Sequence, residues 1–157
     1  MLAIDPSIGS SVSSMGWALY VAGELDSAGV VDIPSELSNP KKMQEISKVL
    51  LEFKDIDLLV VENIAPTRGG PGSRAFINKS WKTLHQATGA AIASVRCEDV
   101  IEVAPISWKR FAKVEDGYVK SDVADAVMIG YTALWEAADH LGLPVPTRHF
   151  LTDREME

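Results

Sequence analysis

The amino-acid sequence predicts an α/β fold built on one mixed sheet with helices on both faces. Three observations predict it. Strand-like segments joined by short turns open the chain, strands and helices alternate after residue 39, and the apolar run at 57–62 is too short for a helix. With 157 residues, 46% of them hydrophobic, the chain can bury one core and has little room for a second. We therefore expect a single domain over residues 1–157.

The first part of the chain predicts an antiparallel meander followed by a helix. Residues 2–5, 17–22 and 27–33 have strand character and are separated by glycine- and serine-containing turns, and Pro34 ends the third strand. Asn39 and Pro40 are typical of an N-cap and a first helical residue. Apolar residues then recur at helical spacing up to Phe53, so a helix is expected there.

The second part predicts the alternating elements that place parallel strands in the same sheet. The run at 57–62 is expected to be a central strand buried on both faces. A loop rich in proline and glycine (65–73), a helix (78–95), a strand (100–104) and a short helix after Pro105 follow. The last helix is expected to start at Ser121 as its N-cap and to extend to about residue 141, leaving 142–157 as a loose C-terminal tail.

Composition and charge exclude several classes of protein. The single cysteine, Cys97, excludes a disulfide framework and a cysteine-rich zinc site. No apolar run is long enough for a membrane span and the N-terminus has no signal-peptide pattern, so a cytoplasmic protein is expected. The net charge of −7 argues against bulk coating of nucleic acid, yet residues 66–120 hold nine basic and five acidic residues. This local excess indicates a local anionic ligand.

Four acidic residues occupy positions typical of a ligand site. Asp5 and Glu62 end predicted strands, and ligands of open α/β sheets bind beyond the carboxyl ends of strands. Asp122 and Asp125 share one face of the first turn of the last helix. Taken singly, each has a structural explanation: a helix N-terminus for Asp122 and Asp125, an exposed strand end for Glu62 and a turn start for Asp5.

Together, the four acids predict a metal site. Converging carboxylates repel one another strongly unless divalent cations lie between them. Oxygen ligands without cysteine or histidine favour Mg²⁺ or Mn²⁺, and two such ions per site can activate water and stabilise the leaving oxygen of a phosphodiester. The sequence therefore predicts Mg²⁺- or Mn²⁺-dependent chemistry on phosphodiesters.

Three acidic motifs resemble those of RuvC-type Holliday-junction resolvases, members of the ribonuclease H-like nuclease superfamily. They are LAIDPSIGSSVSSMGWALY (2–20), LLVVENI (58–64) and KSDVADAVMIGYTAL (120–134), and the segment NKSWKTLHQATGAAIASV (78–95) is similar to the family's second helix. The long serine-rich first turn, the short segment between Val103 and Asp122 and the negative net charge indicate a divergent branch, with a phage origin as one option.

The resemblance implies a ribonuclease H-like fold and an Mg²⁺-dependent crossover junction endodeoxyribonuclease of DNA recombination and repair. Its metal ligands would be Asp5, Glu62, Asp122 and Asp125. It further implies a homodimer that binds four-way DNA junctions and nicks two opposing strands, in a bacterial or phage-infected cytoplasm. The aromatic residue of the loop after the second acid would be Phe76, placed against the junction centre, and a hydrophobic staple at the next helix is an equal alternative.

Basic residues near these motifs are candidates for DNA contacts. Lys120, two residues before Asp122, is positioned for the scissile phosphate, because a lysine is otherwise disfavoured at a helix start. Arg68, Arg74, Lys79 and Lys82 flank the glycine-rich loop and form the best candidate patch for tracking a DNA backbone. Lys109, Arg110 and Lys113 fit either a flanking phosphate or the charged outer face of a short helix. Trp108, beside them, fits either a packed or an interfacial position.

Other functions remain open at this point. A ribonuclease H would cut RNA–DNA hybrids with the same chemistry, and no residue indicates recognition of a 2′-hydroxyl. A catalytically silent module that binds branched DNA is a second alternative, against which the complete set of four acids argues. An actin-like sugar kinase or ATPase also has an aspartate followed by glycine in its first hairpin, but it normally needs two such domains.

Overall fold

The computed structural model describes residues 1–6, 14–63, 79–114 and 121–141. Three strands come first, β1 (Leu2–Asp5), β2 (Ser14–Val21) and β3 (Glu24–Asp32). Helices and strands then alternate in the order α1 (Asn39–Leu50), β4 (Ile56–Glu62), α2 (Lys79–Ser94), β5 (Cys97–Val103), α3 (Pro105–Val114) and α4 (Asp122–Leu141). The predicted meander and the alternation after it are confirmed, and the short helix expected after Pro105 has ten residues.

The strands form one mixed sheet in the order β3-β2-β1-β4-β5. β1 pairs antiparallel with β2, which pairs antiparallel with β3, whereas β4 pairs parallel with both β1 and β5. The α/β class and the mixed sheet predicted from the sequence are therefore confirmed. The run at 57–62 belongs to an interior strand, but the central position is occupied by β1, because the meander adds two strands on its other side.

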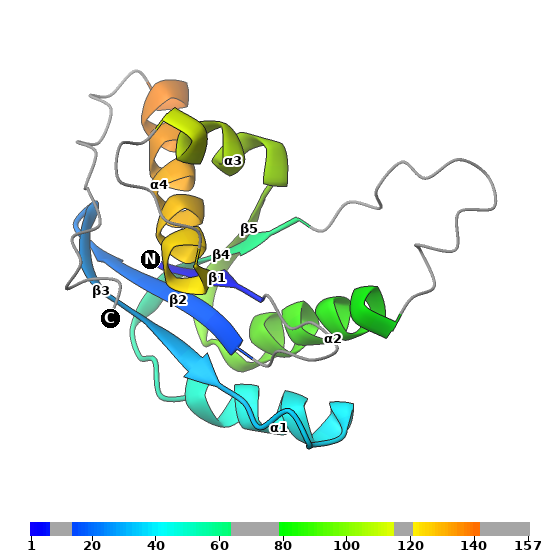
Figure 1. The fold of residues 1–157 in the computed structure, drawn as a ribbon. Helices are drawn as coiled ribbons and strands as arrows, with labels where there is room; N and C mark the ends of the chain where they lie inside the picture. Colours follow the sequence, from blue (N-terminus) through cyan, green and yellow to red (C-terminus); the bar gives the residue numbers. More distant parts are fainter. Residues whose placement is uncertain (7–13, 64–78, 115–120, 142–157) are drawn as a thin grey trace.

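Helices cover both faces of this sheet (Figure 1). α1 and α2 pack together over one face, where Ile46 and Leu50 of α1 and Ala87 of α2 join fully buried strand residues. α3 and α4 cover the other face, where Ala126 and Ile129 of α4 are fully buried. This two-sided burial explains why Leu59, Val60 and Val61 of β4 are consecutive and all solvent-inaccessible.

Some boundaries differ from those expected. The N-cap of α1 is Ser38 rather than Asn39, and the Asn39 side chain instead donates a hydrogen bond to Thr83 Oγ1 of α2 at 3.1 Å. β2, β3 and β5 each begin three residues earlier than their apolar residues indicate. Most of these early residues are polar or small, Met15 and Leu25 being the exceptions, and pairing with neighbouring strands extends the strands through them.

None of the helices in the described ranges is long and apolar enough to cross a membrane.

Candidate active site

The first two acidic residues meet because β1 and β4 are parallel neighbours. Ile4 pairs with Val61 in the ladder, so the next residues along each strand, Asp5 and Glu62, lie side by side at the carboxyl ends. Ile4 and Val61 point into the core beneath α1 and α2. Successive side chains of a strand alternate between faces, so Asp5 and Glu62 both point to the face covered by α4.

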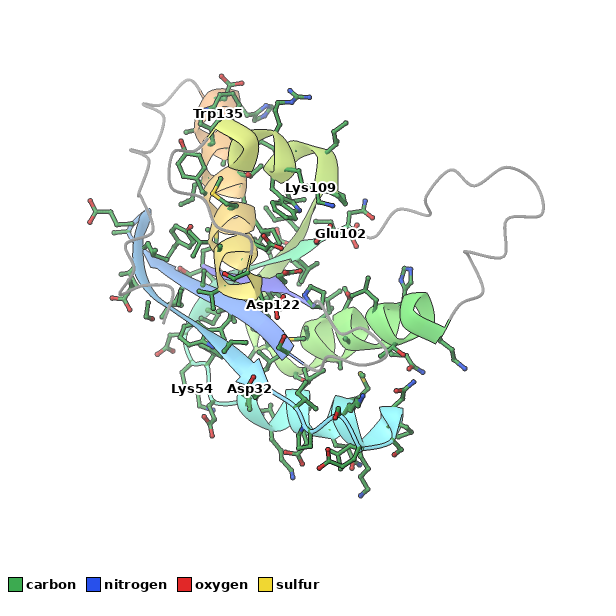
Figure 2. All side chains as sticks on the ribbon, in the orientation of Figure 1. Asp32, Lys54, Glu102, Lys109, Asp122 and Trp135 are labelled. Carbon is green, nitrogen blue, oxygen red and sulfur yellow. The ribbon has the colours of Figure 1, made fainter. Side chains whose placement is uncertain are left out.

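The start of α4 carries the other two acids to the same place. Ser121 caps the helix, since its hydroxyl accepts a hydrogen bond from the Ala124 N–H at 3.1 Å. Asp122 and Asp125 then occupy the first turn, as expected, and Figure 2 shows Asp122 at the end of α4 that meets the sheet. Asp125 is buried and Asp122 is half-buried.

β2 positions this helix end directly. Gly16 pairs with Asp5, and a Cβ at position 16 would lie 1.9 Å from the Asp122 carbonyl oxygen, so only glycine allows the contact. Two residues earlier on the same strand, the buried Ser14 hydroxyl donates a hydrogen bond to Asp122 Oδ2. The strand next to Asp5 thus fixes both the backbone and the side chain of Asp122.

The rest of α4 is held against the sheet by small residues and one anchor. A Cβ at Gly130 would lie 3.0 Å from the Cβ of Ala3 and 2.4 Å from the Tyr20 ring, which shows how closely the helix approaches β1 and β2. The Tyr20 hydroxyl donates a 2.6 Å hydrogen bond to the carbonyl of Val127. Burial raises the pKa of this phenol, so it stays protonated as a donor.

The electrostatics of Asp5 show that the four carboxylates influence one another. Asp5 is only 4% exposed, and its Oδ2 atom is buried without a hydrogen-bond partner. Burial, followed by the negative charges of Asp125, Glu62 and Asp122, raises the pKa of the Asp5 carboxyl from 3.8 to about 8, whereas Lys109 acts in the opposite direction. Asp5 therefore prefers to be protonated at neutral pH unless positive charge is added to the site.

Glu62 is flanked by residues of α3. Burial raises the pKa of its carboxyl and Asp125 adds to this effect, while the positive charge of Lys109 and the indole N–H of Trp108 lower it. Lys109 is exposed, and its Nζ atom lies 5.4 Å from the centre of the Trp108 ring (Figure 2 shows Lys109 on α3). Lys109 is thus a cation close enough to act on both Asp5 and Glu62.

These residues fit a divalent-cation site in their chemistry. The donors are carboxylate oxygens, one of them is buried and unpartnered, and their mutual repulsion is what added positive charge would relieve. Within the described part of the chain, no three His, Cys, Asp or Glu side chains are already gathered as a metal-binding group. The arrangement is therefore a cluster of repelling neighbours that a cation would have to draw together.

The predicted DNA contacts divide into described and undescribed residues. Lys82 is exposed on α2, and Lys109 and Arg110 are exposed on α3. Lys79 and Lys113 are described only through the backbone of α2 and α3. The remaining ones, Arg68, Arg74, Phe76 and Lys120, lie outside the described residues.

Three residues of the site were not singled out from the sequence as functional. Ser14 and Gly16 act on Asp122 through a contact between β2 and α4, and Trp108 acts on Glu62 from α3. Gly16 directly precedes the predicted strand at 17–22, and a glycine at that place was the one signal available for a close backbone approach. Ser14 was one of several serines in the first turn and carried no distinguishing signal.

A separate open cleft of about 480 Å³ lies at the end of the sheet away from the four acids. It is lined by residues that precede or begin β4 and β5, which are Phe53, Lys54, Asp55, Ile56, Asp57, Arg96, Cys97 and Glu98. Because β4 and β5 are parallel, this cleft lies at their amino ends, a strand length away from Glu62. It is not part of the carboxylate cluster.

The sheet order and the helices on both faces define the ribonuclease H-like fold. Among solved structures, the chain is similar to Thermus thermophilus RuvC in complex with a Holliday junction substrate, with a TM-score of 0.63, 17% identity and coverage of 94% of this chain and 99% of that one. It is also similar to another Thermus thermophilus RuvC structure, with a TM-score of 0.59, 18% identity and coverage of 94% and 100%. No family model and no curated protein sequence matches the chain. The protein therefore has the fold of RuvC at low sequence identity.

Proposed function

We propose that the protein is a structure-selective endodeoxyribonuclease that resolves four-way and other branched DNA by metal-dependent paired nicking. The observation that carries this proposal is the buried, unpartnered Asp5 carboxylate oxygen beside three further carboxylates at the carboxyl edge of the sheet. The RuvC structure of the same fold that contains a Holliday junction supports branched DNA as the substrate. The proposal places the enzyme among the phosphodiester hydrolases of DNA recombination and repair.

In this proposal Asp5, Glu62, Asp122 and Asp125 hold Mg²⁺ or Mn²⁺, with two ions per site. When bound, such ions supply an activated water and neutralise the charge on the leaving oxygen of a phosphodiester. Asp5, whose pKa is raised by the other three acids, would have to be deprotonated to hold a cation. β1, β4 and α4 hold the carboxylates on three separate rigid elements.

Basic residues bind the DNA phosphates around this cluster. Among the described cations, Lys109 alone lowers the pKa of both Asp5 and Glu62. Lys109 is therefore proposed as the first contact to the phosphate bound beside these acids. Lys120 is proposed as a second contact to the scissile phosphate. Flanking contacts are proposed for Arg68, Arg74, Lys79, Lys82, Arg110 and Lys113, and Phe76 is proposed to enter the junction centre.

Paired nicking requires two active sites, so we propose a homodimer in which residues 1–157 of each copy form a single nuclease domain with a C-terminal tail at 142–157. Each site would then cut one of two opposing strands. We place this activity in the cytoplasm of a bacterium or of a phage-infected cell.

The test is cleavage of a labelled synthetic four-way junction, compared with linear duplex and an RNA–DNA hybrid, in Mg²⁺, in Mn²⁺ and in EDTA. Paired nicks in opposing junction strands are expected with either ion and are expected to disappear in EDTA. Glu62→Gln should abolish them. The matched control is Asp57→Asn, which changes an exposed acid at the other end of the same strand and should cut normally.

The outcomes separate the alternatives. Cutting confined to the hybrid would assign the protein to the ribonuclease H class. Junction binding without any cutting, in every metal, would assign it to silent binding modules. A Phe76→Ala variant that turns over junctions as fast as the wild type would remove Phe76 from the proposal and leave the metal site unaffected.

A further inference from the structure

Trp108 lies in the first turn of α3 and belongs to the same core cluster as Val60 of β4 and Val103 of β5. α3 begins two residues after β5, and its first turn is closed by a hydrogen bond from the Ser107 N–H to the Ala104 carbonyl at 3.0 Å. The residue after Glu62, Asn63, donates its backbone N–H to the Val103 carbonyl at 2.8 Å. These two bonds tie the end of β4 to the start of α3, so the first turn of α3 is held beside Glu62.

The indole of Trp108 is buried in a way that packing alone does not explain. Its side chain is 4% exposed and joins the core beneath α4, yet its Nε1 atom is buried and has no hydrogen-bond partner. An indole N–H can only donate, and leaving a buried donor unsatisfied costs about 1–3 kcal/mol. A phenylalanine would fill similar space without this cost.

The Glu62 carboxylate is the acceptor on which the Trp108 indole N–H acts. The indole N–H lowers the pKa of Glu62, which means that it stabilises the charged form, although the geometry falls short of a formed hydrogen bond. The same ring carries the Lys109 ammonium on its face at 5.4 Å. One side chain therefore faces both a carboxylate and a cation of the candidate site.

We propose that Trp108 is a positioning residue, whose buried indole N–H donates to the Glu62 carboxylate and fixes its orientation, while its ring holds the Lys109 ammonium beside that carboxylate. The inference rests on the proposed function for the role of Glu62 as a metal ligand. Hydrogen bonds from neighbouring groups commonly orient metal ligands in this way, and their loss lowers metal affinity about 10–100-fold.

The direct test observes the indole N–H of Trp108 in a proton–nitrogen correlation spectrum of the isotope-labelled, metal-free protein. The signal is assigned in the wild-type chain by triple-resonance experiments. Glu62→Gln should move it upfield, because a neutral amide oxygen is a weaker acceptor than a carboxylate. Asp57→Asn, an acid-to-amide change on the same strand, should leave it in place. A Trp108 signal that does not respond to Glu62→Gln overturns the inference.

A second measurement uses Trp108→Phe, which keeps an aromatic ring for packing and for Lys109 but removes the N–H. Mn²⁺ affinity, measured by titration of the protein alone, should fall about tenfold. Junction cleavage, if present, should be recovered at saturating Mn²⁺, whereas a purely structural role would lower the rate at every metal concentration. Wild-type Mn²⁺ affinity in Trp108→Phe contradicts the inference.

The two proposals fail in different ways. If no substrate is cut but the Trp108 signal responds to Glu62→Gln, the proposed nuclease activity is wrong and the positioning contact stands. If junctions are cut and the signal does not respond, the contact is wrong and the nuclease activity stands.

Discussion

Gly16 lies against the backbone of Asp122, so that a Cβ at position 16 would come within 1.9 Å of the Asp122 carbonyl oxygen. Gly16 also pairs with Asp5 across the β1–β2 ladder. Gly16 therefore contacts both Asp5, at the end of β1, and Asp122, at the start of α4. The distance between these two acids depends on this glycine. The carboxylate cluster is thus determined by backbone packing as well as by the acids themselves.

Gly16→Ala is expected to destabilise the fold and to displace Asp122. The added methyl group would overlap a backbone carbonyl, which cannot rotate away, and such overpacking typically costs about 1–3 kcal/mol. Urea denaturation measures the loss, and Mn²⁺ titration measures the displaced ligand. Gly89→Ala is the matched control, because nothing lies within 4 Å of its Cβ position on α2. This control should gain about 0.5–1 kcal/mol from helix propensity.

Ser14→Ala is expected to weaken metal binding while leaving the fold intact. The Ser14 hydroxyl donates to Asp122 Oδ2, and without it the carboxylate loses the contact that fixes its orientation. We expect metal affinity to fall about tenfold. Ser27→Ala removes a comparable serine–aspartate hydrogen bond, to Asp26 at 3.2 Å on the exposed side of β3, and should leave metal affinity unchanged. Equal affinities in Ser14→Ala and the wild type would show that Ser14 does not position Asp122.

The raised pKa of Asp5 predicts a characteristic pH dependence of the metal-free protein. Its pKa is about 8 in the folded state and about 3.8 in the unfolded chain, so the folded state binds more protons between these values. The stabilisation is therefore fully present below about pH 4 and is lost as the pH rises toward 8. Each pH unit in this window changes the free energy of unfolding by up to about 1.4 kcal/mol.

Asp5→Asn should remove this dependence, because an amide does not titrate. The difference in free energy of unfolding between Asp5→Asn and the wild type, measured in EDTA, should grow in favour of the variant from pH 5 to pH 8. Adding Mg²⁺ at pH 8 should stabilise the wild type and not the variant, since binding requires the deprotonated carboxylate. A difference that is constant across the pH range would contradict the raised pKa.

The positions of the four acids could be predicted from the sequence because they depend on local patterns. Asp5 and Glu62 end apolar runs, and Ser121 marks the helix start that precedes Asp122 and Asp125. Their convergence also depends on strand order and on the alternation of side chains. The sequence predicted a mixed sheet but not its strand order, so the adjacency of β1 and β4 that brings Asp5 beside Glu62 is seen only in the structure.

The supporting residues could not be predicted, because they depend on contacts between distant elements. Ser14 and Asp122 are 108 positions apart, and no local pattern distinguishes Ser14 from the other serines of the first turn. The relation between Trp108 and Glu62 depends on the direction in which α3 leaves β5. Similarly, Asn39 looked like an N-cap from its neighbour Pro40, but the approach of α2 gives its side chain a partner in Thr83.

Lys109→Gln is expected to separate metal binding from catalysis. Lys109 is a positive charge close to Asp5 and Glu62, so its removal also removes a charge that repels bound cations. Metal affinity at pH 8 should therefore stay the same or rise. The rate of junction cleavage at saturating Mg²⁺ should fall about 10²–10³-fold, because a cation beside the phosphate stabilises the charge that develops during cleavage.

The control for this prediction is Lys54→Gln. Lys54 is also exposed, but it follows α1 at the far edge of the sheet, where its ammonium donates to the Leu51 carbonyl at 3.0 Å (Figure 2). Cleavage by this variant should match the wild type. If Lys109→Gln cuts junctions at the wild-type rate, Lys109 is not the essential phosphate contact and Lys120 takes that role. The double variant Lys109→Gln/Lys120→Gln would then show the loss that neither single variant shows alone.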